Sequence, residues 1–220
     1  MKIVKLVLVL AAFHCFASAN AQISLGVSTT WGETWQDYGD DFNRPGTDFK
    51  LSSFRYSLSA YYAINSFLEI GLEPAYVGRG AACEPGFVWQ NPFVIQDATF
   101  EGNYIEVPLM LQGKFNVFSE KLLVMPKVGG GPAYLVNAYR SVKFIDPERS
   151  DERWKVDFEE ESTIERLDFG IHAGLAIGYQ LGPGILQAEA RYYNGLKDTS
   201  SLLTSLNRSL HYGLGYTIFL

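Results

Sequence analysis

Apolar residues alternate with polar or small residues in about eight segments of this chain. The clearest is residues 167–180, where every second residue from Leu167 to Tyr179 is apolar. Asp168, His172 and glycines occupy most of the positions between them. A repeat of two residues is the period of a β-strand with one apolar and one polar face. The chain is therefore predicted to be all-β.

The connections between these segments alternate between long and short. The long, polar connections are predicted at Trp31–Lys50, Arg79–Asp97, Arg140–Phe158 and Leu196–Asn207. The short ones are predicted at Asn65–Ser66, Asn116–Lys121 and Gly182–Gly184. This rhythm is typical of an up-and-down barrel in a bacterial outer membrane, which has short periplasmic turns and longer outer loops.

The two faces of the segments favour a membrane barrel. The polar face is rich in Gly, Ser and Ala, which suits the crowded interior of a narrow barrel. Aromatic residues lie near both ends of the apolar face, as the two membrane interfaces favour. They are Tyr62, Phe67, Phe115, Phe118, Tyr179 and Tyr216 near the short turns, and Tyr76, Tyr104, Tyr134, Tyr139 and Tyr192 nearer the long loops. We therefore expect an eight-stranded antiparallel up-and-down transmembrane β-barrel.

The N-terminal residues predict export. Lys2 and Lys5 precede a mostly apolar stretch, and Ala19-Asn20-Ala21 forms a small-x-small cleavage site. Residues 1–21 are therefore expected to be a cleaved signal peptide, with cleavage between Ala21 and Gln22. Residues 22–220 would form the barrel domain, with both termini in the periplasm.

Charge and cysteine content narrow the function further. The formal charge is −6, and loss of Lys2 and Lys5 would leave 16 basic against 24 acidic residues, or −8. No basic patch stands out, so nucleic acid is not an expected partner. Only Cys83 would survive cleavage, which precludes an intrachain disulfide and leaves the role of this thiol open.

Charged residues recur on the face predicted to point inward. An eight-stranded barrel is just wide enough to be filled by side chains, and charges removed from water persist when they are paired. We therefore expect a structural ion-pair network that closes the lumen, with a narrow ion or proton path as the alternative. Its predicted members are Arg55, Lys114, Lys127, Arg191, Glu69, Glu73, Glu106, Asp168 and Glu189.

No catalytic, cofactor or metal site is predicted. His172 and His211 both point inward by parity, which leaves a lipid-modifying enzyme as an alternative. An acyl hydrolase or transferase would need a serine, a histidine and an acid in one place, and no spacing here marks a nucleophile. The acids Asp37–Asp41 do not match an EF-hand loop.

The long loops are the expected working surface, because loops on a rigid scaffold commonly carry binding. Trp31–Lys50 mixes aromatic and acidic residues, and Ile145–Arg166 is densely charged. Divalent cations bridging to lipopolysaccharide, or a protein partner, would suit these acids. Solvated loops without a ligand are the simpler interpretation.

Four motifs, in order, resemble the PorT-like outer-membrane β-barrel family of Bacteroidetes-type Gram-negative bacteria. They are YIEVPLMLQGKF (Tyr104–Phe115), GGGPAYLVNAY (Gly129–Tyr139), DFGIHAGLAIGYQL (Asp168–Leu181) and LQAEARYYNGLKD (Leu186–Asp198). The resemblance implies an integral outer-membrane protein. Some members of that family support protein export, and the family supplies no catalytic residue.

The sequence thus favours a non-enzymatic outer-membrane scaffold or binding module, and the resemblance implies an accessory role in protein secretion or envelope assembly. Its expected partners are outer-membrane lipid, lipopolysaccharide and secretion or assembly proteins, with no evident small-molecule substrate. A lipid-modifying enzyme and a soluble ligand-binding β-barrel, which would also show alternation, remain the alternatives.

Overall fold

The structure is a computed structural model of the 220-residue chain, and it describes residues 23–38, 50–83, 95–119, 121–144, 148–202 and 204–220. The predicted signal peptide, including Ala21 and the following Gln22, lies outside the described residues. Parts of all four predicted long connections, and residue 120 of the short connection Asn116–Lys121, do so as well.

The described residues form β-strands joined by turns. They are β1 (Ile23–Asp37), β2 (Leu51–Ala63), β3 (Leu68–Leu72), β4 (Ala75–Cys83), β5 (Ile95–Glu106), β6 (Leu109–Gly113), β7 (Phe115–Asn116), β8 (Leu122–Phe144), β9 (Glu152–Lys155), β10 (Leu167–Leu181), β11 (Gly184–Gly195) and β12 (Leu206–Phe219). No helix in this part of the chain has the length and hydropathy needed to cross a bilayer.

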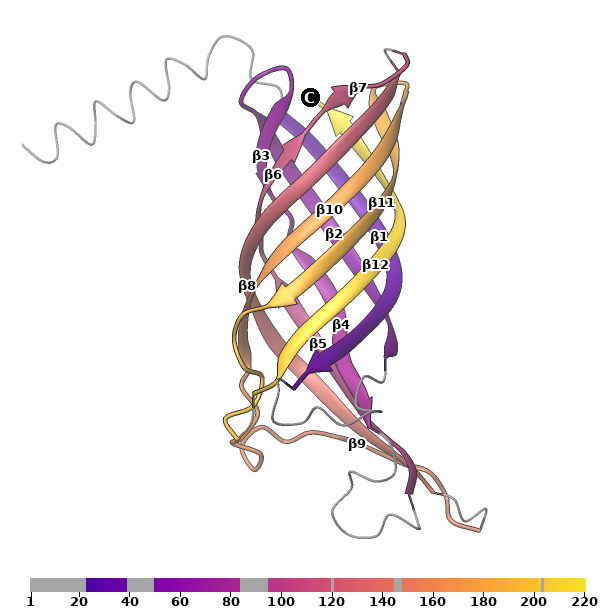
Figure 1. Cartoon of the computed structure of the whole chain (residues 1–220), viewed down its shortest axis with the longest axis vertical. Coiled ribbons are helices and arrows are strands. Elements are labelled where there is room, and N and C mark those ends of the chain that lie inside the picture. The colour runs from indigo at the N-terminus through magenta and orange to yellow at the C-terminus, as the bar shows by residue number, and fades with distance from the viewer. Residues whose placement is uncertain (1–22, 39–49, 84–94, 120, 145–147, 203) are drawn as a thin grey trace, which may run out of the picture.

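These strands close into a barrel (Figure 1). Around the barrel, the described residues form eight strand positions, each hydrogen-bonded to its two neighbours. β3 and β4 together form one of these eight positions, which is interrupted at Pro74. β5 and β6 together form another, which is interrupted at Pro108. Proline has no N–H to give to the ladder, so each regular strand stops there. The proline carbonyls still accept bonds, from Leu58 N to Pro74 O at 3.0 Å and from Glu73 N to Pro108 O at 3.2 Å. All neighbours are antiparallel, and β1 pairs with both β2 and β12, which confirms the predicted barrel.

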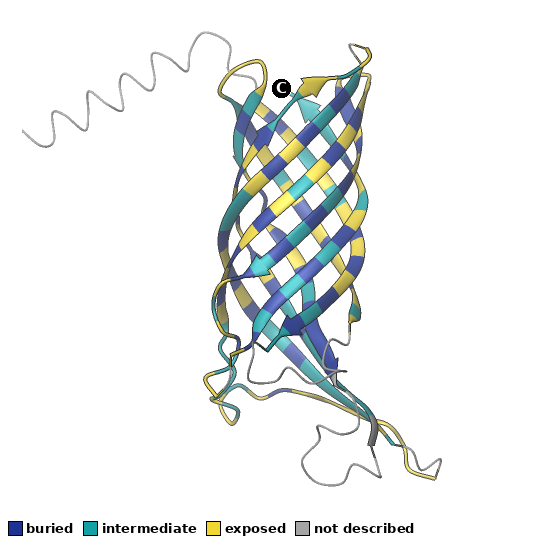
Figure 2. Ribbon diagram, viewed as in Figure 1, coloured by how far each residue is buried: buried dark blue, intermediate teal, exposed yellow. Residues whose placement is uncertain are grey.

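The alternation along each strand separates two environments. On β10, Leu175 is 48% exposed on the outer face, whereas Asp168 is 1% exposed inside. Exposed and buried residues alternate in the same way all over the wall (Figure 2). Leu, Ile, Val and aromatic side chains make up this exposed face, so the barrel needs an apolar solvent around it.

Several strands are longer than the sequence pattern indicated. β4 continues to Cys83 and β8 to Phe144, so the predicted loop starts at Arg79 and Arg140 are wrong. β1 likewise continues to Asp37, past the predicted start at Trp31. The extensions of β4 and β8 remain in strand conformation because β5 pairs along both of them, and the extension of β1 does so because it pairs with β12 as far as Asp37.

The prediction of the aromatic belt is also wrong at one residue, Tyr104. Tyr104 lies inside the barrel, where its side chain is buried, while Tyr76 and Tyr134 lie on the outer face as predicted. The parity of β5 explains the difference, because Ile105 faces outward and its neighbour Tyr104 must face inward.

The membrane topology predicts a depth-dependent cost for a charge on the outer face. Leu175→Arg, near the middle of β10, should lower the free energy of unfolding by about 2–4 kcal/mol, and Leu181→Arg, at the end of the same strand, by about 0–1 kcal/mol. Urea unfolding in lipid vesicles, followed by tryptophan fluorescence, measures both. Equal losses at the two positions would contradict the placement of the bilayer.

Candidate functional site

The most distinctive feature of the barrel is a set of charged side chains buried in its lumen. Arg55 comes from β2, Glu106 from β5, Lys127 from β8, and Glu189 and Arg191 from β11. All of them lie on the inward face of their strands, where alternation places every second side chain. The barrel therefore concentrates charges from distant parts of the sequence in one narrow space.

Glu73, between β3 and β4, is the centre of the half nearer the short turns. Its carboxylate lies 2.5 Å from Arg191 Nη1, 3.5 Å from Lys127 Nζ and 3.7 Å from Arg55 Nη2. Tyr61 Oη donates to Glu73 Oε1 at 2.5 Å. Glu189 adds a second carboxylate, 3.2 Å from Lys127 Nζ. Each buried cation thus has a carboxylate neighbour, as burial requires.

Glu106 is the centre of the half nearer the long loops. Its carboxylate accepts from Arg55 Nε at 2.9 Å and from the guanidinium of Arg79. Arg55 therefore links the two halves, because it also lies beside Glu73.

Arg79 also connects Glu106 to an aromatic and amide cluster. Its guanidinium carbon lies 3.6 Å from the centre of the Tyr193 ring, and Nη1 lies 3.9 Å from Asp168 Oδ2. Tyr193 Oη and Asn207 Nδ2 donate to Asp168 at 2.9 and 3.0 Å. A Cβ on Gly170 would lie 2.4 Å from the Tyr193 ring, so glycine leaves the space that the tyrosine occupies.

Two of the predicted lumen residues stand apart. Lys114 and Glu69 form a 2.9 Å ion pair near the short turns, and Gln112 Nε2 donates to Glu69 at 2.7 Å. Among the described residues, no ion pair joins these two to the other seven predicted residues. Lys114 is the most accessible member, with a side chain 17% exposed.

The sequence interpretation missed Arg79, because it placed this residue at the start of a loop. The signal was the continued alternation of Val77, Arg79 and Ala81, all buried in the structure. With Arg79 the lumen set holds five basic and five acidic residues, so the formal charges cancel. A balanced set needs no counterion to make its burial tolerable.

The two lumen histidines contact different groups. His211 Nε2 lies 2.6 Å from Ser53 Oγ, and His172 Nε2 lies 3.8 Å from Glu106 Oε2. In the described part of the chain, no hydrogen bond or ion pair connects His211 to a carboxylate, so the Ser53–His211 pair has no acid to orient it. The part of the chain that the structure describes contains no group of three or more His, Cys, Asp or Glu side chains placed to bind a metal.

Removal of one buried partner should be costly. Arg79→Met leaves Glu106 and Asp168 with less compensation and should lower the free energy of unfolding by about 3–5 kcal/mol. The matched control is Arg153→Met, because Arg153 pairs with Glu101 at an exposed position and should cost about 0–1 kcal/mol. Urea unfolding in lipid vesicles compares the two variants. Equal losses in the free energy of unfolding would show that burial of the ion pair does not determine the cost of removing one partner.

Comparisons with known proteins place the chain in a family. The model of the family described as outer membrane protein beta-barrel domain matches residues 16–201. No curated protein matches the sequence at a significant level.

Solved structures with a similar course of the chain include three outer-membrane proteins. Neisserial surface protein A is 14% identical, with a TM-score of 0.46, and the match covers 90% of this chain and 98% of that one. The attachment invasion locus protein Ail of Yersinia pestis is 13% identical, with a TM-score of 0.41 and coverages of 89% and 98%. OprG of Pseudomonas aeruginosa is 12% identical, with a TM-score of 0.46 and coverages of 92% and 96%. Because the family model matches most of the sequence, the chain belongs to the outer membrane protein β-barrel domain family.

Proposed function

We propose that this outer-membrane barrel is a closed, non-enzymatic scaffold whose outer strand extension binds another protein of the cell envelope. The role would be accessory to protein secretion or envelope assembly, as the PorT-like motifs imply. The proposal places the short turns and both termini in the periplasm, and the extended strands outside the cell. The observation that carries it is the ordered extension of β8.

β8 is 23 residues long, whereas a tilted strand needs about 9–11 residues to cross the hydrocarbon layer. Its distal part pairs with β5 on one side and with β9 on the other. The resulting sheet projects beyond the barrel at the end opposite the short turns (Figure 1). The length and pairing of β8 support a surface of paired strands that lies outside the bilayer.

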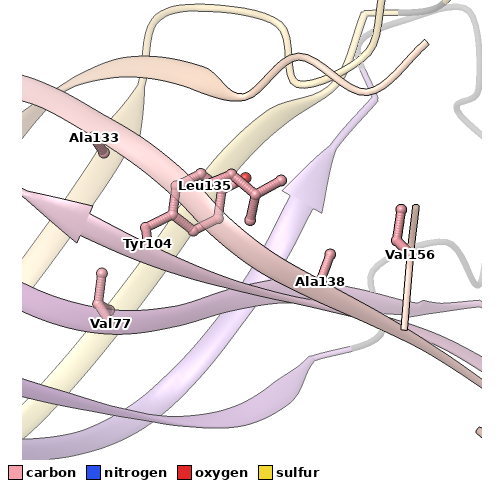
Figure 3. Packing of buried hydrophobic residues seen from close by; sticks show 6 residues of the cluster. All are labelled: Val77, Tyr104, Ala133, Leu135, Ala138 and Val156. Atoms are coloured by element: carbon pink, nitrogen blue, oxygen red, sulfur yellow. The ribbon is translucent and has the colours of Figure 1, made fainter. Parts of the chain in front are cut away.

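An apolar cluster fixes the segment that follows β9 onto the barrel. Val156 is buried with Leu135 and Ala138 of β8, and its amide donates to Ala138 O at 2.9 Å. Val77, Tyr104 and Ala133 complete the cluster (Figure 3). Since the segment is anchored by a small core, side chains on its outer side have defined positions for a partner to bind.

The surface of this extension has the residue types that dominate protein interfaces. Trp154 on β9 lies opposite Arg140, and the guanidinium of Arg153 lies 4.8 Å from the Tyr139 ring centre. Trp, Tyr and Arg are the residues most enriched at binding hot spots. β9 pairs with β8 alone among the described strands, and a strand paired on one edge is a place where a strand of another protein can add.

Two observations support a scaffold over the other functions. The buried ion pairs fill the narrow lumen, which argues against a channel. Among the described residues, no carboxylate is hydrogen-bonded to His211, which argues against acyl transfer by a serine–histidine–acid site. A loss of lipid modification in His211→Ala, with the barrel intact, would instead favour the lipid-modifying enzyme.

A photo-cross-linking residue at Trp154 tests the binding surface in the native cell. Trp154 is 41% exposed on the extension, and Tyr212, 55% exposed on the outer face of β12, is the control. We expect Trp154 to yield a discrete protein adduct, identified by mass spectrometry as a secretion or envelope-assembly component, and Tyr212 to yield lipid adducts. Lipid adducts from both positions would refute the proposed surface.

The closed lumen makes a separate prediction. The folded barrel, inserted into a planar bilayer with insertion checked by heat-modifiable gel mobility, should give no steady conductance, because paired charges occupy the bore. Reproducible single-channel steps from the unmodified chain would favour the narrow ion path instead.

A further inference from the structure

The barrel wall has a break between β2 and β4. Their ladder consists of Arg55↔Val77, Tyr56↔Tyr76 and Ser57↔Ala75, yet β2 begins at Leu51 and β4 continues to Cys83. In a continued register Phe54 would lie opposite Gly78, and Ser52 opposite Gly80. No ladder pair joins these positions among the described residues, so the two strands separate toward the outer end.

Gly80 shows where the missing bonds go. Its amide would face Ser52 in a continued ladder, but it donates to Thr34 Oγ1 at 3.3 Å. Thr34 belongs to β1, which lies on the other side of β2. β4 therefore leans inward past the end of β2, and this displacement opens the wall.

A cavity of about 250 Å³ occupies the break. Its lining includes three aromatic residues and several uncharged polar ones, among them Phe54, Tyr56, Tyr76, Ser52, Ser53 and Asn103. Pockets for drug-sized ligands are about 300–1,000 Å³, so this one has room for one end of a larger molecule.

The rim of the cavity faces lipid. Phe54, Tyr56 and Tyr76 are all exposed on the outer face of the barrel, and the Phe54 and Tyr56 rings are near-parallel with centroids 6.3 Å apart. A molecule with one end in the cavity would lay its remaining length on these rings. The occupant must therefore have an apolar part and reach the site from the bilayer.

The interior of the cavity is polar but has no unpaired charge to offer. Arg79 is bonded to Glu106, and Glu101 lies 2.8 Å from Arg153. A charged group entering here would lack a counterion and would be costly to bury. Several lining groups are already bonded, since Ser53 pairs with His211, Thr34 with Gly80 and Arg208, and Asn103 Nδ2 with Asn137. The lining groups with capacity for another bond are the Ser52 hydroxyl and Asn103 Oδ1, together with main-chain groups of β2 and β4 beside the break. Such groups suit a ligand end with hydroxyl and carbonyl groups.

From this combination we infer that the β2–β4 break is a binding site for the uncharged, hydroxyl- and ester-bearing end of a single-chain lipid from the surrounding bilayer. The polar end occupies the cavity, and the acyl chain lies across Phe54, Tyr56 and Tyr76. The lumen behind it is closed by Arg79 and Glu106, so the site is a blind pocket in the wall. This inference does not depend on the proposed scaffold function.

A photoactivatable monoacylglycerol, with a diazirine close to its ester, tests the site in phosphatidylcholine vesicles that contain the folded barrel. We expect adducts, mapped by mass spectrometry, to concentrate on residues 51–56, 76–80 and 101–103. Phe54→Ala should reduce them about five-fold, as the loss of an aromatic contact implies. Phe169→Ala is the matched control, since Phe169 is 48% exposed on β10 against 53% for Phe54 and lies away from the cavity.

A second variant fills the site without removing an aromatic ring. A Cβ on Gly78 would lie 3.3 Å from Ser53 Cβ and 3.9 Å from Asn103 Oδ1, with nothing else within 4 Å. Gly78→Val should therefore occupy the cavity and abolish the adducts there, while heat-modifiable gel mobility reports an intact barrel. If this variant does not fold, the comparison of Phe54→Ala with Phe169→Ala decides alone.

Three results would overturn the inference. Adducts spread evenly around the apolar band would show general lipid contact. Equal effects of Phe54→Ala and Phe169→Ala, or full labelling in folded Gly78→Val, would show that the cavity is not the site. Displacement of the probe by oleate as effectively as by unlabelled monoacylglycerol would refute the requirement for an uncharged end.

Discussion

Closure of the hydrogen-bonded wall is the constraint on which the rest of this structure depends. Peptide N–H and C=O groups at membrane depth have no water to bond, so the strands must satisfy one another around a complete ring. β1 meets this requirement by pairing with β2 on one side and β12 on the other. Once the ring closes, alternate side chains are committed to lipid or to the lumen. With eight strand positions around the ring, the lumen is too narrow to hold a column of bulk water and must be filled by side chains.

The lumen charges follow from that confinement. Glu73 and Glu106 each lie between basic side chains from other strands, and Arg55 contacts both carboxylates. Burying such a network costs desolvation free energy, and removing one of its members strongly lowers stability. An arrangement of the strands that left one charge unpaired would therefore be unfavourable, which favours a single arrangement. The same paired charges occupy the lumen, so we propose that function lies on the strand extension and on the lipid-facing side of the wall.

The departures from a regular barrel are also the places where function is proposed. β8 and β5 extend past the bilayer, and the segment containing Val156 folds back onto them. β4 leaves β2 after Val77 and bonds to Thr34 instead, which opens the wall beside an aromatic rim. In both cases the ladder is unfinished on one edge, and an unfinished edge is what another molecule can complete.

The sequence by itself determined the strand period, the faces of the strands and the rhythm of the connections, because alternation and turn residues are local properties. It therefore indicated the eight-stranded barrel and the inward direction of residues such as Arg55, Asp168 and Arg191. It could not determine where β4 and β8 end, since Arg79 and Arg140 stay in strands through pairing with the distant β5. Nor could it pair the charges or reveal the β2–β4 break, because partners such as Glu73 and Arg191, or Gly80 and Thr34, meet only when the ring has closed and set the register between strands.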